Sequence, residues 1–328
     1  MTDREAYQAL LAGEPVWQIT TAESRMFNPS VIPDATARGF VMEAGNPFPK
    51  GGGGKDMFGV NWEYDPVIRG STVRPGQPML LDANDWEDVL VWPDVDNWNW
   101  ADSAARNRTF LTEGKFNIMP FMTGWYERLV SLMDFAGAAI AMVDEDQTDA
   151  VKAFFDKLTD MYIKILDHAI EAYPLIDGFW IHDDWGSAQN TFFSPETCAE
   201  MIVPYMRRVT DFLHAKGKHC DFHSCGMNDR QIPNMIAGGW DSWMPQDIND
   251  IEKIYEEYGD QLIIHVTYPW PAPEASEQEQ LAALESYMAK YCHYRKPSLL
   301  NDRNQPGFTE FIRQELRERS MERFGTKK

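Results

Sequence analysis

The sequence has few cysteines and no long hydrophobic run, and each shortage excludes a class of protein. Four cysteines in 328 residues cannot form the disulfide framework of a small secreted protein. No apolar run approaches the roughly 20 residues that a membrane-spanning helix needs. Residues 1–15 also lack the basic and apolar regions of a secretory signal. We therefore expect a cytoplasmic protein with reduced thiols.

Positive charge is scarce as well. The chain has 30 basic and 51 acidic side chains, which gives a formal net charge of −21. Such a surface cannot neutralise a run of phosphates, so nucleic acid is excluded as a partner and an anionic membrane is disfavoured. The composition is nevertheless 44% hydrophobic and 13% aromatic, enough to bury a large core. We expect a globular protein of enzyme size.

Neither of the common glycine motifs for nucleotides is present. Glycines 51–54 precede Lys55, but the spacing GxxxxGK[ST] is missing, so these residues predict a loop. No GxGxxG follows a predicted strand, which argues against a Rossmann fold.

The chain divides into two stretches of different character. Residues 1–115 are dense in Gly, Pro and Trp and predict an irregular N-terminal part, with a short helix over 2–13 and a first strand over 16–20. From residue 116 onward, apolar strands alternate with amphipathic helices. The predicted strands are 116–122, 176–182, 218–223, 240–244, 262–267 and 298–300. The predicted helices are 147–172, 194–214, 276–290 and 309–319, with others starting at 229 and 249.

These strands are too apolar to have a face in water, which is typical of a parallel sheet covered by helices. An open doubly wound sheet would also fit this alternation. We predict an α/β fold, a (β/α)8 TIM-like barrel with an irregular N-terminal extension, forming one domain over residues 1–328. In such barrels the active site lies at the carboxyl ends of the strands.

Two polar clusters follow predicted strands. In the first, alternation along the strand places His219, Asp221, His223 and Cys225 on one face. An imidazole and a thiolate at a strand end suit Zn²⁺, although zinc needs a third and usually a fourth ligand. The competing interpretation is a hydrogen-bonded histidine and an inert buried cysteine.

The second cluster is His182, Asp183 and Asp184, at the end of the strand over 176–182. An imidazole and two carboxylates near a core are costly unless they are paired or used. They could ligate a metal, transfer a proton or position a substrate. The competing interpretation is a loop whose aspartates bond backbone amides.

Four aromatic residues near predicted strand ends could wall a pocket for a flat or cationic substrate. They are Trp125, Tyr126, Trp180 and Trp185. Ordinary core packing is the alternative for each of them.

At these clusters the chain resembles the uroporphyrinogen decarboxylase superfamily, and within it the corrinoid-dependent methyltransferases. The resemblance rests on segments 57–62, 86–93, 177–187, 193–196, 222–226 and 245–246. It implies a TIM-like barrel. His223 and Cys225 are similar to the metal ligands of the zinc methyltransferases, which carry the pattern His-x-Cys-Gly.

Two departures from the family patterns matter. The decarboxylases carry an arginine-rich segment, RQAGR, whereas residues 16–25 here contain one arginine, so decarboxylation of a porphyrinogen is disfavoured. Related methyltransferases that use coenzyme M have a further cysteine after the last barrel strand, and residues 299–303 lack one. The third ligand therefore stays open between Cys292, Asp302 and a carboxylate of the Asp183–Asp184 pair.

The resemblance implies an enzyme that moves a methyl group from a small methylated donor to the cobalt of a separate corrinoid protein. Zinc would polarise the heteroatom of the donor, and His182, Asp183 and Asp184 would position the substrate or manage its proton. A methoxylated aromatic ether is the favoured donor, and a methylated or quaternary amine is the alternative. Other readings are transfer from corrinoid to a thiol or tetrahydrofolate, a metal-free decarboxylase, and a non-catalytic subunit that binds a corrinoid protein.

Overall fold

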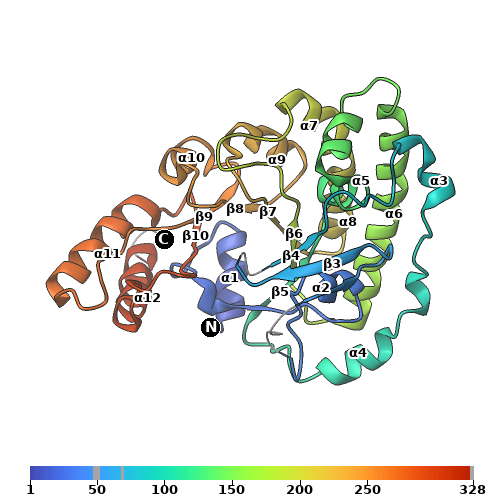
Figure 1. Ribbon diagram of the computed structural model, residues 1–328. Coiled ribbons are helices and arrows are strands. Elements are labelled where there is room, and N and C mark those ends of the chain that lie inside the picture. The colour runs from blue at the N-terminus through green and yellow to red at the C-terminus, as the bar shows by residue number, and fades with distance from the viewer. Residues whose placement is uncertain (47–51, 68–69, 326–328) are drawn as a thin grey trace. The chain divides into compact units, whose positions relative to one another are not determined.

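The computed structural model describes residues 1–46, 52–67 and 70–325, and the chain folds into two compact units. Unit 1 comprises Met1–Arg25, Glu113–Phe116 and Asp241–Lys328, and unit 2 comprises Met26–Thr112 and Asn117–Trp240. In each unit parallel strands alternate with helices (Figure 1). Within the described ranges, no helix is both long and apolar enough to cross a membrane. The single domain over residues 1–328 stays a prediction.

Three parallel strands form the centre of unit 2. They are β5 (Phe116–Phe121), β6 (Gly178–His182) and β7 (His219–His223), and they pair in this order. Every residue of β5 and β6 is buried, as expected for strands covered on both faces. The strands predicted over 116–122, 176–182 and 218–223 are confirmed.

Helices follow each of these strands. Their bounds are α5 (Trp125–Ala141), α6 (Thr148–Ala172), α7 (Pro195–Met201), α8 (Val203–Ala215) and α9 (Ile232–Ala237). The helix predicted over 147–172 is confirmed. The continuous helix predicted over 194–214 is wrong, because the chain breaks at Ile202 and restarts with Pro204 in the first turn of α8. Proline lacks the N–H that would continue the preceding helix.

The N-terminal part of unit 2 is more regular than the sequence predicts. It contains the antiparallel strands β2 (Gly53–Lys55), β3 (Asn61–Asp65) and β4 (Gly70–Val73). Its helices are α2 (Pro33–Ala37), α3 (Trp86–Val89) and α4 (Trp100–Asn107). The predicted glycine loop is wrong over residues 53–54, and Gly51 lies outside the described residues. Gly53 has φ of +108°, and a Cβ there would lie 2.9 Å from a carbonyl oxygen of β3, so the hairpin requires glycine.

A buried ion-pair network joins this N-terminal part to α5. The guanidinium of Arg128 is fully buried and pairs with Asp34 of α2 and with Asp56, whose Oδ2 lies 2.6 Å from Nη1. The same oxygen of Asp56 accepts a hydrogen bond from Nε1 of Trp62 at 3.0 Å. Arg128 thereby fixes α2 and β3 beside α5.

Unit 1 has its own parallel strands, β8 (Ser242–Met244), β9 (Ile263–Val266) and β10 (Ser298–Leu300). Its helices are α1 (Asp3–Leu11), α10 (Ile251–Tyr258), α11 (Glu277–Tyr291) and α12 (Glu310–Gly325). Thr2 and Ser276 begin α1 and α11 with capping boxes. These elements confirm the predicted ones to within a few residues, except that α12 runs further.

The predicted first strand over 16–20 is wrong. The first strand is β1 (Ser24–Met26). In the earlier segment the N–H of Gln18 donates to Oγ of Ser320 and its side chain bonds the carbonyl of Ser298, so the segment lacks a regular ladder.

Candidate metal centre and cavity

The candidate site lies in unit 2, where β6 and β7 end. The two strands pair in parallel with His182 opposite His223, so these imidazoles leave the sheet side by side. Their ring centroids are 5.2 Å apart. The loops that follow carry Asp184 and Cys225. Both polar clusters predicted from the sequence therefore meet at one place.

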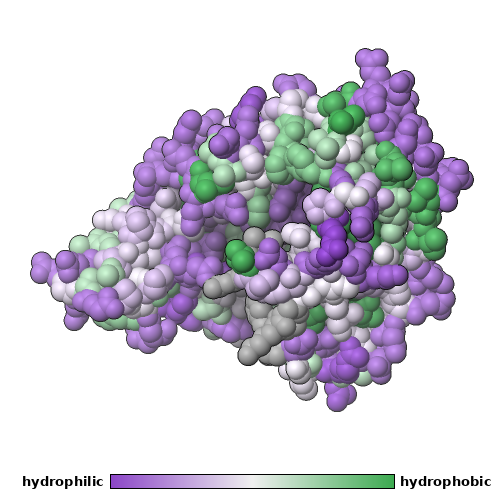
Figure 2. Space-filling view, in the orientation of Figure 1, coloured by the Kyte–Doolittle hydropathy of each residue, from purple (hydrophilic) through white to green (hydrophobic). Residues whose placement is uncertain are grey.

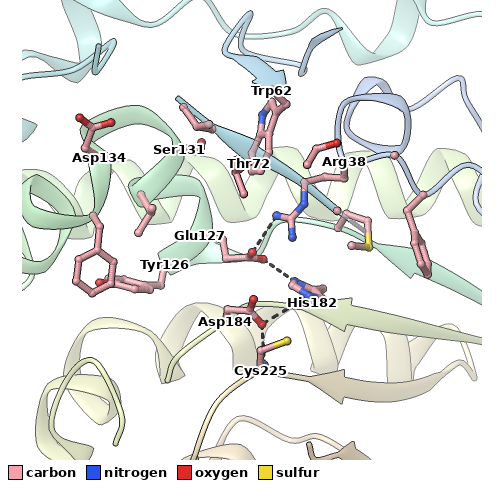
Figure 3. A pocket seen from close by; sticks show the side chains of 18 of the residues that line it. Arg38, Trp62, Thr72, Tyr126, Glu127, Ser131, Asp134, His182, Asp184 and Cys225 are labelled. Carbon is pink, nitrogen blue, oxygen red and sulfur yellow. Dashed lines mark hydrogen bonds and ion pairs between the residues drawn. The ribbon is translucent and has the colours of Figure 1, made fainter. Parts of the chain in front are cut away.

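Four side chains converge there, and we call them the ligand cluster: His182, Asp184, His223 and Cys225. One potential ligand atom from each lies within 4.8 Å of all the others. Figure 3 shows three of them, His182, Asp184 and Cys225, side by side. Nε2 of His223 is 3.3 Å from Sγ of Cys225, and Nε2 of His182 is 3.6 Å from Oδ1 of Asp184. Two imidazoles, a carboxylate and a thiol make the donor set that zinc prefers.

Backbone packing brings the two loops together. Gly226 has φ of +96°, and a Cβ at this position would lie 2.2 Å from the carbonyl carbon of Gly186. The backbone N–H of Cys225 donates to Oδ1 of Asp184 at 2.6 Å. The glycines thus let the two loops approach closely, and the hydrogen bond holds Asp184 beside the backbone of Cys225.

The two neighbouring aspartates do different things. Asp183 turns away from the ligand cluster and accepts the backbone N–H groups of Trp125, Tyr126 and Glu127 at 3.1, 3.2 and 2.8 Å. These are the first residues of α5, whose N-terminal amides have no partner within the helix. Burial, with the nearby Glu127 carboxylate, raises the pKa of Asp183 to about 7 against the effect of these hydrogen bonds. Asp183 therefore sets where α5 begins.

Glu127 and Arg38 extend the ligand cluster, and the sequence analysis missed both. Oε2 of Glu127 lies 2.6 Å from Nδ1 of His182, and Oε1 accepts a hydrogen bond from Nη1 of Arg38 at 2.9 Å. The guanidinium of Arg38 also stacks on the ring of Trp62 at 4.7 Å. Glu127 lies in the first turn after β5, the position at which barrel active sites collect polar groups. That rule could have found Glu127, but no pattern pointed to Arg38.

The carboxylates of this site favour positive charge beside them. Burial disfavours the imidazolium of His182, yet the carboxylates of Asp184 and Glu127 outweigh it and raise its pKa well above the ordinary value. Burial would raise the pKa of Asp184, but His182 and His223 lower it below the ordinary value. Burial raises the pKa of the Cys225 thiol. The same carboxylates that favour positive charge on His182 would favour a divalent cation at this place.

The ligand cluster opens into a cavity of about 620 Å³ within unit 2. His182, Asp184 and Cys225 line it at one end. Other parts of its wall come from the N-terminal part, from α5 and from the loop after β6, through Arg38, Phe40, Trp62, Thr72, Tyr126, Ser131, Phe135 and Phe192. Apolar side chains reach the surface over α5 (Figure 2), where Phe135 is 49% exposed. The cavity therefore adjoins solvent at that side, and a small, largely apolar molecule fits it.

The predicted aromatic residues have different environments. Tyr126 lines the cavity. Trp180 stacks on His223 with ring centroids 5.0 Å apart. Trp125 and Trp185 are fully buried, and their Nε1 atoms donate to Thr159 and Asp183. Neither of these two tryptophans is among the residues that line the cavity.

The other residues considered as third ligand belong to unit 1. Cys292 is fully buried at the end of α11, with Sγ 3.4 Å from Oε1 of Gln18, and burial raises the pKa of its thiol to about 12. Asp302 forms an ion pair with Arg313 at 2.7 Å and accepts a hydrogen bond from Thr21. Both have partners of their own, and neither is part of the ligand cluster.

Comparison with known proteins shows the family. The sequence profile described as Uroporphyrinogen decarboxylase (URO-D) matches residues 77–265, which is more than half of the chain. The chain therefore belongs to the uroporphyrinogen decarboxylase family. No curated protein sequence matches it.

Among solved structures, the chain is similar to a methyltransferase from Methanosarcina mazei. The two share 14% sequence identity, 99% of each chain is covered and the TM-score is 0.62, so the likeness concerns the fold. A lyase/mutase candidate from Burkholderia cenocepacia J2315 shares 15% identity over 96% of this chain and 84% of its own, with a TM-score of 0.32. The family and the first likeness confirm the predicted TIM-like α/β fold.

Proposed function

We propose that this protein is a methyltransferase that moves a methyl group from a small methylated donor to the cobalt of a corrinoid carried by a separate protein. The observation that carries the proposal is the position of the ligand cluster: a thiol, a carboxylate and an imidazole line one end of a cavity whose other walls are largely apolar. The methyltransferase of similar fold supports the same reaction class.

His223, Cys225 and Asp184 would hold zinc, which leaves Cys292 and Asp302 with their structural partners. The donor set and the excess of buried negative charge both fit this ion. When bound, zinc supplies a Lewis acid that polarises the heteroatom of the donor.

The cavity walls select and orient the donor. Trp62, Tyr126 and Phe135 offer ring faces and edges to a flat molecule, which favours a methoxylated aromatic ether. Asp183 contributes indirectly, because it fixes the start of α5 and with it Tyr126 and Glu127.

The proposed transfer is a displacement at the methyl carbon of the donor. The methyl carbon would pass from the ether oxygen to the Co(I) corrinoid of the partner protein, and the electron pair of the broken carbon–oxygen bond would leave with the aryl oxygen. The walls hold the ether oxygen toward the ligand cluster, and the methyl group toward the approaching cobalt. Arg38 lines the same cavity, with its guanidinium paired to Glu127.

The test uses zinc-loaded protein with chemically reduced cobalamin and two donor classes, a methoxybenzoate and tetramethylammonium. We expect Co(I) absorbance to be replaced by that of methylcobalamin with the aromatic ether, and an equal amount of demethylated product. The Cys225→Ala variant should be inactive, and His168→Ala, a change in α6 away from the residues that line the cavity, should retain full activity.

Other results would overturn the proposal in favour of a stated alternative. Demethylation of methylcobalamin by a thiol or tetrahydrofolate, with no reaction of either donor, would reverse the direction of transfer. Release of CO2 from a carboxylated porphyrinogen by zinc-free protein would make the chain a decarboxylase. Binding of a corrinoid protein without turnover of any donor would make it a binding subunit.

A further inference from the structure

We propose that His182 is a metal ligand through Nε2, and that Glu127, itself held by Arg38, is the positioning residue that orients it. This inference rests on the zinc centre of the proposed function and assigns the fourth ligand. It also gives a role to the two charged residues that no sequence pattern indicated.

The geometry of His182 carries the assignment. Its two ring nitrogens face different partners: Nδ1 lies 2.6 Å from Oε2 of Glu127, whereas Nε2 faces Oδ1 of Asp184 at 3.6 Å. A carboxylate on Nδ1 holds the proton there and leaves the lone pair of Nε2 directed at the ligand cluster (Figure 3). This carboxylate–histidine arrangement is the one that orients metal-bound histidines.

Glu127 is fixed from three directions. Its N–H donates to Asp183 at 2.8 Å, Oε1 accepts from Arg38 and Oε2 faces His182. Both carboxylate oxygens are therefore engaged, and the Glu127 side chain is only 14% exposed. Arg38 is held in turn by the ring of Trp62. Two contacts thus connect Arg38, which lines the cavity, through Glu127 to His182 of the ligand cluster.

Through Glu127, Arg38 also affects which nitrogen of His182 is available to bind a metal. Its guanidinium engages Oε1 of Glu127 and leaves Oε2 for Nδ1 of His182, where a carboxylate oxygen accepts the Nδ1 proton but donates none. Replacement of Glu127 by glutamine keeps the size of the side chain but leaves one oxygen for two donors. Either the bond to Arg38 or the bond to His182 is then lost.

The experiment measures metal binding, with no substrate present. Zinc affinity is determined by competition with a chromophoric chelator, and Co²⁺ is used as a spectroscopic probe for wild type, Glu127→Gln, Arg38→Met and His182→Ala. Asp96→Asn is the matched control, because Asp96 bonds His168 at 2.8 Å in a carboxylate–histidine pair on the surface of unit 2. Thermal unfolding of the metal-free variants checks that each is folded.

We expect Glu127→Gln to lower zinc affinity by about 10- to 100-fold and Arg38→Met by about 10-fold, the range for loss of a partner that orients a ligand. His182→Ala should lower it further and change the Co²⁺ d–d bands, while the thiolate-to-cobalt charge-transfer band from Cys225 persists. Asp96→Asn should match wild type.

Two failures are distinguishable. If wild type binds neither zinc nor Co²⁺, the zinc centre of the proposed function fails. If wild type binds both but folded His182→Ala and Glu127→Gln keep its affinity and its d–d spectrum, the centre stands and our assignment of His182 is overturned.

Discussion

The two parts of unit 2 contribute to the site in different ways. The β/α part supplies the ligand cluster from the ends of consecutive strands, so that strand register alone brings His182 beside His223. The N-terminal part supplies cavity walls, and its side chains are placed by a buried ion-pair network centred on Arg128. The sheet thus determines where the ligand cluster lies, whereas long-range contacts determine the shape of the cavity. Variants can separate the two contributions.

The largest effect should follow from removal of one residue of the ligand cluster. Cys225→Ala removes the only thiol of the ligand cluster, and we expect a loss in zinc affinity above the roughly 100-fold that a lost orienting partner costs. Donor demethylation should disappear with it. Metal analysis after dialysis, beside an activity assay, checks this. Retention of one zinc per chain would show that the ligands lie elsewhere.

Arg128→Met should break the N-terminal part instead. It leaves Asp34 and Asp56 buried without their cation, and removal of one partner from a buried ion pair typically costs about 3–5 kcal/mol. Urea unfolding measures the change, with Arg207→Met, on the exposed face of α8, as control. An unchanged unfolding midpoint would mean that the network does not hold the N-terminal part in place.

Trp62→Leu should alter the wall and leave the metal in place. Loss of its ring face to the donor should raise KM by up to about 10-fold, since an aromatic pair is worth about 0.5–1.5 kcal/mol beyond the area it buries. Zinc affinity should fall less than in Arg38→Met, because Arg38 loses a ring contact but keeps its ion pair with Glu127. Steady-state kinetics with the methoxybenzoate provide the measurement, and a fall in zinc affinity as large as that of Arg38→Met would contradict the division between the two parts.

Trp125→Phe should have the smallest effect. The ring is buried, and the variant loses the hydrogen bond from Nε1 to Thr159, worth about 1 kcal/mol. Since Trp125 does not line the cavity, KM and zinc affinity should be unchanged while stability falls slightly. A KM effect equal to that of Trp62→Leu would place Trp125 at the substrate.

This contrast also explains how far the sequence could be interpreted. Apolar runs located β5 and β6, and the polar residues at the ends of β6 and β7 marked His182, Asp184, His223 and Cys225 as candidates. The same reasoning treated Asp183 and Asp184 alike, because neighbouring residues in a loop have no period to separate them. It also proposed Trp125 and Trp185 as pocket residues, although proximity to a strand end does not say which way a ring turns.

Local sequence patterns could not predict that Arg38 and Trp62 lie at the site, and the reason is physical. Their positions depend on Arg128, which is 72 residues from Asp56 and 94 from Asp34 in the chain. No spacing rule connects such residues. The three-stranded antiparallel sheet of β2, β3 and β4 was missed. Its glycines predict a loop as long as the close contact between Gly53 and β3 is unknown.

The most direct test of the account is zinc-edge X-ray absorption of the zinc-loaded protein. The ligand cluster predicts one sulfur at about 2.3 Å, from Cys225, and three nitrogen or oxygen atoms at about 2.0–2.1 Å, from His182, Asp184 and His223. Cys225→Ala should remove the sulfur contribution. A second sulfur in wild type would bring another thiol, such as Cys292, into the centre, and a shell without sulfur would contradict the assignment outright.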